Sequence, residues 1–178
     1  VSLLNDCKYG YDVRDNVLRL SLLRSPIEPD PHADEGEHQF TYALLPHEGD
    51  WRTCSVHEGY EMNAPLLAAV VETSSGNLPA AAAFVETDRP NVIVETVKQA
   101  EDSDALVVRL YEAHGARGVV KIRFGMPVSR IIECNLMEDR EGEVTLNKNN
   151  SITLQIKPFE VRSFLVYANY LDKGYRDS

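Results

Sequence analysis

Hydrophobic and polar residues alternate along much of the chain, and this period of two is the pattern of half-buried β-strands. In the first half the alternation predicts strands at 17–23 (VLRLSLL) and 39–45 (QFTYALL), and Pro46 ends the second strand because proline has no amide hydrogen to donate. The second half contains seven short segments with strand character, separated by turn-forming residues. They lie at 92–97, 105–111, 118–124, 130–136, 143–146, 152–156 and 161–166. This number and spacing are typical of a β-sandwich.

One short helix interrupts the predicted strands near 51–62. Asp50, after Gly49, is of the residue type that caps a helix N-terminus, and Trp51 and Tyr60 would supply apolar contacts. The stretch 80–85 (AAAAFV) fits either a helix or a buried strand, and the hydrophobic period does not choose between them. The fold class predicted is therefore mainly all-β, a β-sandwich architecture with one short helix.

The spacing of the strands changes along the chain and predicts two domains. Before residue 88 the strands are separated by long loops, whereas from 89 to 170 they follow one another closely, as in a small sandwich. We place the boundary near 87–90 and interpret 171–178 as a polar tail.

Composition and net charge argue against several classes of function and partner. Hydrophobic residues make up 43% and charged residues 26% of the 178, which is typical of a globular protein. A net charge of −10 opposes binding to nucleic acid, which requires clustered Lys and Arg. No apolar run approaches the roughly 20 residues that cross a bilayer, and we expect no membrane partner. Three distant cysteines, Cys7, Cys54 and Cys134, favour a reducing, cytoplasmic compartment over a disulfide framework or a zinc site.

The sequence contains no catalytic motif of specific spacing, such as GxSxG, HExxH, a Walker loop or an EF-hand. It also begins directly on an apolar run, Val1-Ser2-Leu3-Leu4, without an initiator methionine. We expect a fragment or processed piece of a longer protein, with no catalytic residue of its own.

Two polar segments and one arginine are candidates for ligand binding. Segment 5–12 (NDCKYGYD) mixes amide, acid, cation and aromatic groups, as a sugar site does, although a polar hairpin turn is the favoured interpretation. Segment 29–38 (PDPHADEGEH) offers carboxylates and imidazoles for calcium or sugar hydroxyls, but a solvated acidic loop is favoured. Arg24 could grip an oxygen-rich ligand through its planar fork or form a local salt bridge.

Several blocks resemble the family 38 retaining α-mannosidases of the cytosolic and vacuolar type. The resemblance begins with 3–10 (LLNDCKYG) and 18–26 (LRLSLLRSP) and extends, in order, over residues 1–166. The further blocks are 29–31, 33–34, 36–38, 40–44, 46–47, 95–101, 109–115, 133–136 and 157–160.

This resemblance implies a scaffold for chemistry that another domain performs. Residues 1–88 would be the C-terminal part of the family's large β-sandwich domain, and 89–170 its small terminal sandwich. A β/α catalytic domain of the same parent chain would carry the catalytic carboxylates and a divalent metal, zinc or cobalt, and would hydrolyse α-mannoside oligosaccharides; this piece would hold no cofactor. Residues at the rim of the sugar pocket would be Asn5, Asp6, Lys8, Tyr9, Arg24 and His38.

A second hypothesis is a free-standing carbohydrate-binding sandwich. In it Tyr9, Tyr11 and Trp51 would act as stacking platforms for sugar rings, and the acidic loop would add hydrogen bonds. Either form could assemble into an oligomer.

Overall fold

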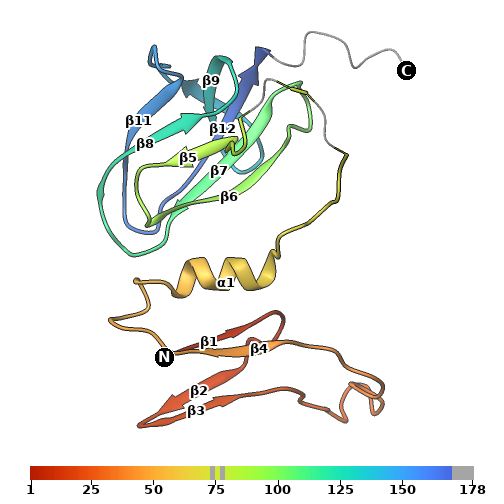
Figure 1. The fold of residues 1–178 in the computed structure, drawn as a ribbon. Coiled ribbons are helices and arrows are strands. Elements are labelled where there is room, and N and C mark those ends of the chain that lie inside the picture. Colours follow the sequence, from red (N-terminus) through yellow and green to blue (C-terminus); the bar gives the residue numbers. More distant parts are fainter. Residues whose placement is uncertain (73–74, 77–78, 170–178) are drawn as a thin grey trace. The chain divides into compact units, whose positions relative to one another are not determined.

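The computed structural model of the chain describes residues 1–72, 75–76 and 79–169. It divides into two compact units, Val1–Thr73 and Ser74–Ser178 (Figure 1). This division falls earlier than the predicted boundary near 87–90, because strand β5 (Val85–Thr87) pairs with β8 (Gly118–Phe124) of the second unit. The predicted tail at 171–178 lies outside the described residues.

The strands of the first unit form two antiparallel ribbons. β1 (Ser2–Asn5) pairs with β4 (Tyr42–Leu45), and β2 (Tyr11–Arg14) pairs with β3 (Val17–Leu20). The β2–β3 hairpin turns at Asp15 and Asn16, and Asp15 has the positive φ of 53° that tight hairpin turns require. The predicted strands at 17–23 and 39–45 are therefore present but shorter, and segment 5–12 contains the start of a strand as well as a turn.

Helix α1 (Ser55–Asn63) begins four residues later than the sequence predicts. Asp50 is not its cap. The Asp50 carboxylate instead accepts a 2.9 Å hydrogen bond from the backbone N–H of Arg52, and its carbonyl accepts a 3.1 Å bond from the N–H of Thr53, so residues 50–53 form a separate turn. The helix lies on β1, to which the Asn63 side chain donates a 3.2 Å hydrogen bond at the carbonyl of Asn5.

The second unit is a β-sandwich, as predicted. Its five-stranded sheet has the order β10-β9-β12-β7-β6, and its three-stranded sheet has the order β11-β8-β5. The remaining strands are β6 (Val92–Gln99), β7 (Leu106–Glu112), β9 (Val128–Cys134), β10 (Arg140–Glu143), β11 (Ser151–Ile156) and β12 (Val161–Ala168). Six of the seven predicted strands are found with bounds shifted by at most two residues, whereas the predicted strand at 143–146 overlaps β10 only at Glu143, and residues 144–146 lie outside any strand. In the ambiguous stretch 80–85 only Val85 belongs to a strand.

The core of the sandwich lies between its two sheets and is built from alternate residues of each strand. Val108, Leu110 and Phe164 of the large sheet meet Val120 and Ile122 of the small sheet, and none of the five is exposed. A second cluster lies on the opposite face of the large sheet, where Val107, Ile132 and Leu165 are buried with smaller side chains. The central strands are thus apolar on both faces, which explains why their sequences read as nearly continuous hydrophobic runs.

Candidate functional site

A groove of about 560 Å³ opens on the first unit beside the β2–β3 hairpin. Its lining comes from three parts of the sequence: Lys8, Gly10, Ser21, Leu22, Leu23, Arg24, Asp34 and His38. The structure therefore brings together three of the six predicted rim residues, which are Lys8, Arg24 and His38. A volume of this size falls in the range of ligand-binding clefts.

Backbone contacts hold the sides of this groove together. The N–H of Ser21 donates a 2.7 Å hydrogen bond to the carbonyl of Gly10, which extends the hairpin ladder past the end of β3. A side chain at position 10 would place its Cβ only 3.2 Å from the Cβ of Ser21. Glycine is therefore the residue that allows the two segments to lie this close.

The acidic loop closes the groove by folding back on itself around Asp34. The Asp34 carboxylate accepts a 2.8 Å hydrogen bond from the backbone N–H of Ser25, and the His38 ring donates from Nε2 to the Asp34 carbonyl at 2.8 Å. The hydrogen bond from Ser25 lowers the pKa of Asp34 against a smaller opposing effect of burial. This carboxylate is thus ionised and already bound to the backbone.

Lys8 lies on an aromatic ring at the same site. Its ammonium is 4.7 Å from the centroid of the Phe40 ring, a cation–π contact that positions the charge without using its N–H donors in an ion pair. Lys8 is half-buried, whereas Arg24 and His38 are exposed.

The other predicted rim residues do not line the groove, and two of them, Asn5 and Asp6, shape the neighbouring turn. The Asn5 side chain accepts a 2.6 Å hydrogen bond from the N–H of Lys8, and Asp6 accepts a 2.9 Å bond from the N–H of Thr41. Hydrogen bonds, first from the Cys7 side chain and then from the Thr41 backbone, lower the pKa of Asp6. Tyr9 is 84% exposed.

The calcium hypothesis for 29–38 gains no support. Asp30 accepts a 2.9 Å hydrogen bond from the N–H of His32, and the His32 ring lies 3.1 Å from Glu35, so these side chains serve the loop itself. Within the described ranges, no group of three or more His, Cys, Asp and Glu side chains could hold a metal ion.

Sequence reasoning missed Ser21 as a groove residue and named Asp34 only as part of segment 29–38, and it also missed the apolar surface beside them. A smaller hollow of about 230 Å³ is lined only by apolar and aromatic side chains of the two ribbons, which are Leu3, Leu18, Leu20, Leu22, Tyr42 and Leu44. The alternation at 17–23 signals this surface, because it places Leu18, Leu20 and Leu22 on one face of the hairpin.

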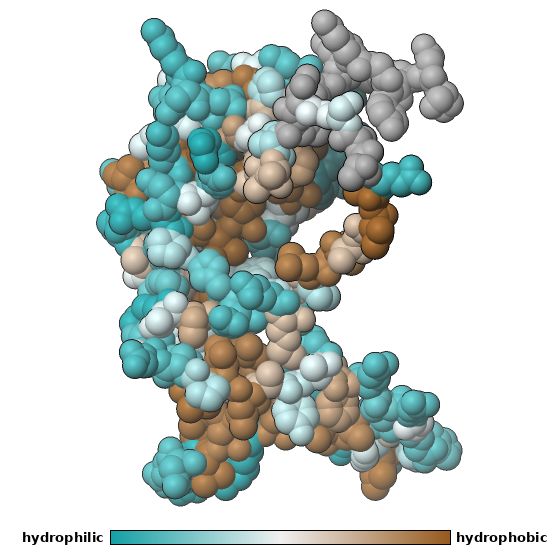
Figure 2. Space-filling model, viewed as in Figure 1, coloured by the Kyte–Doolittle hydropathy of each residue, from teal (hydrophilic) through white to brown (hydrophobic). Residues whose placement is uncertain are grey.

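The first unit has no core of its own. Of its described residues none is buried, and Figure 2 shows hydrophobic residues gathered over its strands. Leu44 is 64% exposed, and Leu66, Leu67 and Val70 of the segment after α1 are completely exposed. Contiguous exposed apolar surface of this kind is typical of sites that bind another protein, a membrane or a ligand.

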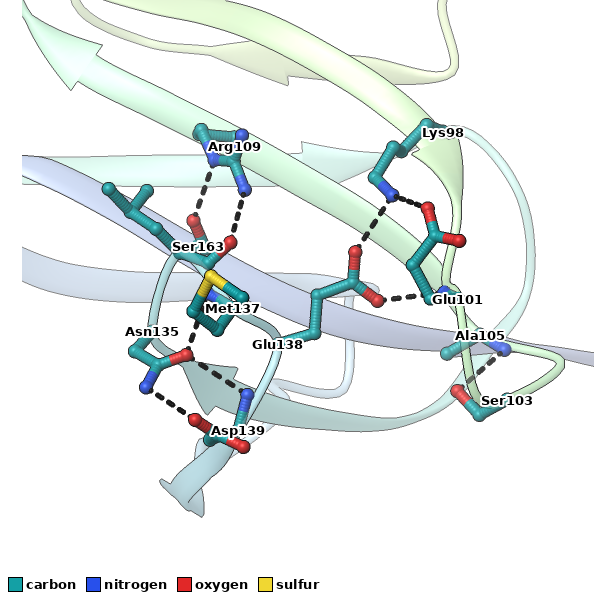
Figure 3. A network of polar contacts seen from close by, with 11 residues as sticks. Lys98, Glu101, Ser103, Ala105, Arg109, Asn135, Met137, Glu138, Asp139 and Ser163 are labelled. Carbon is teal, nitrogen blue, oxygen red and sulfur yellow. Dashed lines mark hydrogen bonds and ion pairs between the residues drawn. The ribbon is translucent and has the colours of Figure 1, made fainter.

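A network of ion pairs and hydrogen bonds connects loops and strands of the second unit (Figure 3). The Lys98 ammonium lies 2.7 Å from Glu101 and 2.8 Å from Glu138, and the Arg109 guanidinium donates a 3.0 Å hydrogen bond to Ser163. The hydrogen bonds with Glu101 and Glu138 raise the pKa of Lys98. These contacts connect the β9–β10 loop to β6. The Glu101 and Glu138 carboxylates are both paired with Lys98, so the network has a structural role.

The all-β fold, with a complete sandwich in one unit and two ribbons without buried residues in the other, defines a pair of β-domains. Comparison with known families agrees. Residues 91–164 match the glycosyl hydrolases family 38 C-terminal β-sandwich domain, and residues 1–32 match the family 38 C-terminal domain. The chain belongs to the C-terminal region of glycosyl hydrolase family 38.

Its relatives are α-mannosidases. The chain is 44% identical to human "Alpha-mannosidase 2C1" over 173 residues, 38% identical to "Alpha-mannosidase G" of Dictyostelium discoideum, and 31% identical to "Alpha-mannosidase" of Saccharomyces cerevisiae. The alignments cover 93%, 95% and 94% of this chain. They cover only 16%, 16% and 17% of the relatives, so the chain spans about one-sixth of their length. No helix in the described ranges is long and apolar enough to cross a membrane.

Proposed function

We propose that this chain is the packing and pocket-completing module of a retaining α-mannosidase that removes terminal α-mannose from oligosaccharides. The observation that carries the proposal is the coreless first unit, whose apolar strands need a protein surface to cover them. The relatives contain about five times more sequence than this chain, which is ample for a catalytic β/α domain to provide that surface.

In this proposal the chemistry belongs to the catalytic domain. Retaining glycosidases need two carboxyl groups about 5–5.5 Å apart across the scissile bond. The metal that the family resemblance implies, zinc or cobalt, does not fit the described residues, which offer no suitable group of ligands. The chain's own contribution is to hold Lys8 and Arg24 where they donate hydrogen bonds at the rim of the sugar pocket, beside the His38 ring, whose Nε2 donates to the Asp34 carbonyl.

The test is a substitution that removes a charge at the rim, made in the complete mannosidase. Arg24→Gln is expected to lower kcat/KM for an α-mannoside about ten-fold, which corresponds to the loss of about one hydrogen bond from a charged donor. Arg14→Gln on β2, outside the groove, removes the same charge and is expected to leave kcat/KM unchanged. Equal effects of the two substitutions would exclude a rim role for Arg24.

The isolated chain provides a second test, because the proposal assigns it no activity. Release of mannose by the 178-residue chain, with zinc or cobalt present, would contradict the proposal. A cytoplasmic location is part of the same proposal and is supported by the free thiols of Cys7, Cys54 and Cys134.

A stand-alone carbohydrate-binding module is the second candidate, favoured by the exposure of Tyr9 (84%) and Tyr11 (72%) on either side of Gly10. Trp51, the third predicted platform, is a weaker candidate because the Arg52 guanidinium already lies 5.1 Å from its ring centroid. Calorimetry of the isolated chain with mannose oligosaccharides separates the two functions. Binding that Tyr9→Ala abolishes would support the module, whereas no detectable heat would favour the packing role.

A further inference from the structure

The groove on the first unit has a charge opposite to that of its surroundings. Residues 1–73 contain 13 acidic and five basic side chains. Two of the five, Lys8 and Arg24, line this one groove together with His38. The only carboxylate in the lining is Asp34. Such a concentration of positive charge in an acidic unit focuses an attractive field on negatively charged ligands.

Among the described residues, Lys8 and Arg24 also have no carboxylate partner, a property they share with Arg14, which lies outside the groove. Arg19 lies 2.7 Å from Asp12 and Arg52 lies 2.8 Å from Asp50. In the part of the chain that the structure describes, no ion pair joins Lys8 or Arg24 to a carboxylate. Asp34, the carboxylate that lines the same groove, accepts a hydrogen bond from the Ser25 backbone. An ammonium and a planar guanidinium therefore present hydrogen-bond donors in one groove.

A neutral sugar and an anion make different demands on such a site. Sugar hydroxyls both donate and accept, so a site for a neutral sugar offers acceptors as well as donors. In this groove one oxygen of the Asp34 carboxylate accepts from the Ser25 backbone and the Asp34 carbonyl accepts from His38, so the acceptors are partly engaged. The ammonium and guanidinium donors match an acceptor-only group, and a guanidinium matches the oxygens of a phosphate or carboxylate in pairs.

We infer that the groove formed by Lys8, Arg24 and His38 binds an oxyanion, a phosphate or carboxylate group, either free or carried on a sugar. This inference deepens the proposed function, on which it rests, by naming the chemical group that the rim recognises. The groove then selects α-mannosides that carry a negative charge, or responds to free anions, in addition to any contact with neutral substrate.

The experiment measures binding to the complete mannosidase by calorimetry, with inorganic phosphate, mannose 6-phosphate and mannose as probes. The expected result is that both phosphates bind at least about ten-fold more tightly than mannose at low salt, and that salt above about 0.5 M weakens the binding through screening. Equal affinity for inorganic phosphate and mannose 6-phosphate assigns the site to the free anion, whereas a preference for the sugar phosphate assigns it to a charged sugar.

Substitutions locate this binding on the groove. Arg24→Gln and Lys8→Gln are each expected to weaken phosphate binding at least about ten-fold, and Arg24→Lys, which keeps the charge but loses the fork, less than Arg24→Gln. Arg14→Gln is the matched control and is expected to have no effect. An unchanged melting temperature shows that the variants fold. If Arg24→Gln does not fold, Lys8→Gln still tests the inference.

Two results would overturn the inference: mannose binding as tightly as mannose 6-phosphate, or phosphate binding that survives both Arg24→Gln and Lys8→Gln. Neither result touches the proposed function, which is judged by kcat/KM for a neutral α-mannoside. If Arg24→Gln lowers that value while phosphate never binds, the rim role stands and the oxyanion site is excluded. If phosphate binds to the groove and Arg24→Gln leaves kcat/KM unchanged, the oxyanion site stands and the rim role of Arg24 is excluded.

Discussion

The side-chain amide of Asn91 donates a 2.7 Å hydrogen bond to the carboxylate of Glu112, a residue at the end of β7 with no exposed surface. The same carboxylate accepts hydrogen bonds from the backbone N–H groups of His114 at 2.9 Å and Phe159 at 3.0 Å. One buried charge therefore joins the start of β6, the β7–β8 loop and the β11–β12 turn at one end of the sandwich.

Replacing this carboxylate is expected to destabilise the second unit. Burial raises the pKa of Glu112, but the hydrogen bonds from Asn91, Phe159 and His114 outweigh it and lower the pKa from 4.5 to about 2. Glu112→Gln keeps the shape but turns one acceptor into a donor that faces other donors, at an expected cost of about 2–3 kcal/mol in the free energy of unfolding. Glu143→Gln, on exposed β10, is the control and is expected to change little. Chemical unfolding of both variants measures the difference, and equal stabilities would contradict the role of Glu112.

The same shift predicts a pH dependence with a definite sign. A carboxyl group whose pKa is lower in the folded state stabilises the fold above the unfolded pKa, 4.5, and loses this contribution as pH falls toward about 2. The free energy of unfolding of the wild type should therefore fall across this window by at most about 3 kcal/mol more than that of Glu112→Gln, and by less where solvent screens the charge. Unfolding curves at several pH values give both slopes. Parallel slopes would show that Glu112 titrates normally.

Gly125, directly after β8, is expected to tolerate no side chain. Its N–H donates a 3.0 Å hydrogen bond to the Phe84 carbonyl, and a Cβ at this position would lie 1.9 Å from the carbonyl oxygen of Ala83. Gly125→Ala must push the segment before β5 away from the sheet, at an expected cost of about 1–3 kcal/mol. Gly118→Ala, at the start of the same strand, meets nothing within 4 Å and is the matched control. Melting temperatures of the two variants that agree would show that this crossing is not tightly packed.

Asn150 connects the turn before β11 to the segment that follows β8. Its side-chain amide donates to the carbonyls of Phe124 (2.6 Å) and Met126 (2.5 Å), and its oxygen accepts a 3.1 Å bond from the N–H of Val128. Its φ of 56° adds a backbone conformation that asparagine tolerates better than most residues. Asn150→Ala is expected to cost about 2–4 kcal/mol because it loses the hydrogen bonds and keeps the strained φ.

Asn150→Gly is the matched variant, because it loses the same hydrogen bonds and removes the strain. It should be more stable than Asn150→Ala by about 1 kcal/mol. Urea titrations of the two variants measure this difference directly. A glycine variant as stable as the wild type would show that the three hydrogen bonds contribute nothing.

The sandwich was predictable from the sequence because its signal is local. Hydrophobic residues alone indicate the buried positions of β7, which include Val107, Val108 and Leu110. Turn residues separate each strand from the next. The first unit was harder to predict, since β1 and β2 are four-residue strands whose partners the period of two does not identify. Asp50 was misread because an Asx turn and a helix N-cap use the same carboxylate-to-backbone bond.

The candidate site was half predictable for a related reason. Lys8, Arg24 and His38 stand out by residue type, but their proximity depends on the Ser21–Gly10 hydrogen bond and on the fold of the acidic loop around Asp34. Asn5 and Asp6 carry the same kinds of polar atoms, and only the structure reveals that the Lys8 and Thr41 amides use them. Chemistry alone does not distinguish a turn-forming side chain from one that lines a groove.

The apolar surface of the first unit predicts that one substitution has different effects on the stability of the isolated chain and of the complete mannosidase. Leu44 is 64% exposed in this chain and lies in a hollow of apolar side chains, whereas the proposed packing would bury it in the complete mannosidase. Leu44→Ser should therefore reduce binding of a hydrophobic dye to the isolated chain, without loss of its stability. The same substitution should destabilise the complete enzyme by about 1.5–3 kcal/mol, the value of burying a leucine side chain.

Leu136→Ser is the control for this comparison, because Leu136 is similarly exposed (62%) but lies in the β9–β10 loop of the self-contained sandwich. It has no assigned partner surface, so its effect on stability should be small in both contexts. Each single substitution is made in the isolated chain and in the complete enzyme, and thermal unfolding gives the change in stability for each of the four proteins. A Leu44→Ser change that is harmless in the complete enzyme would mean that the ribbons stay exposed there, and the packing role of the first unit would have to be abandoned.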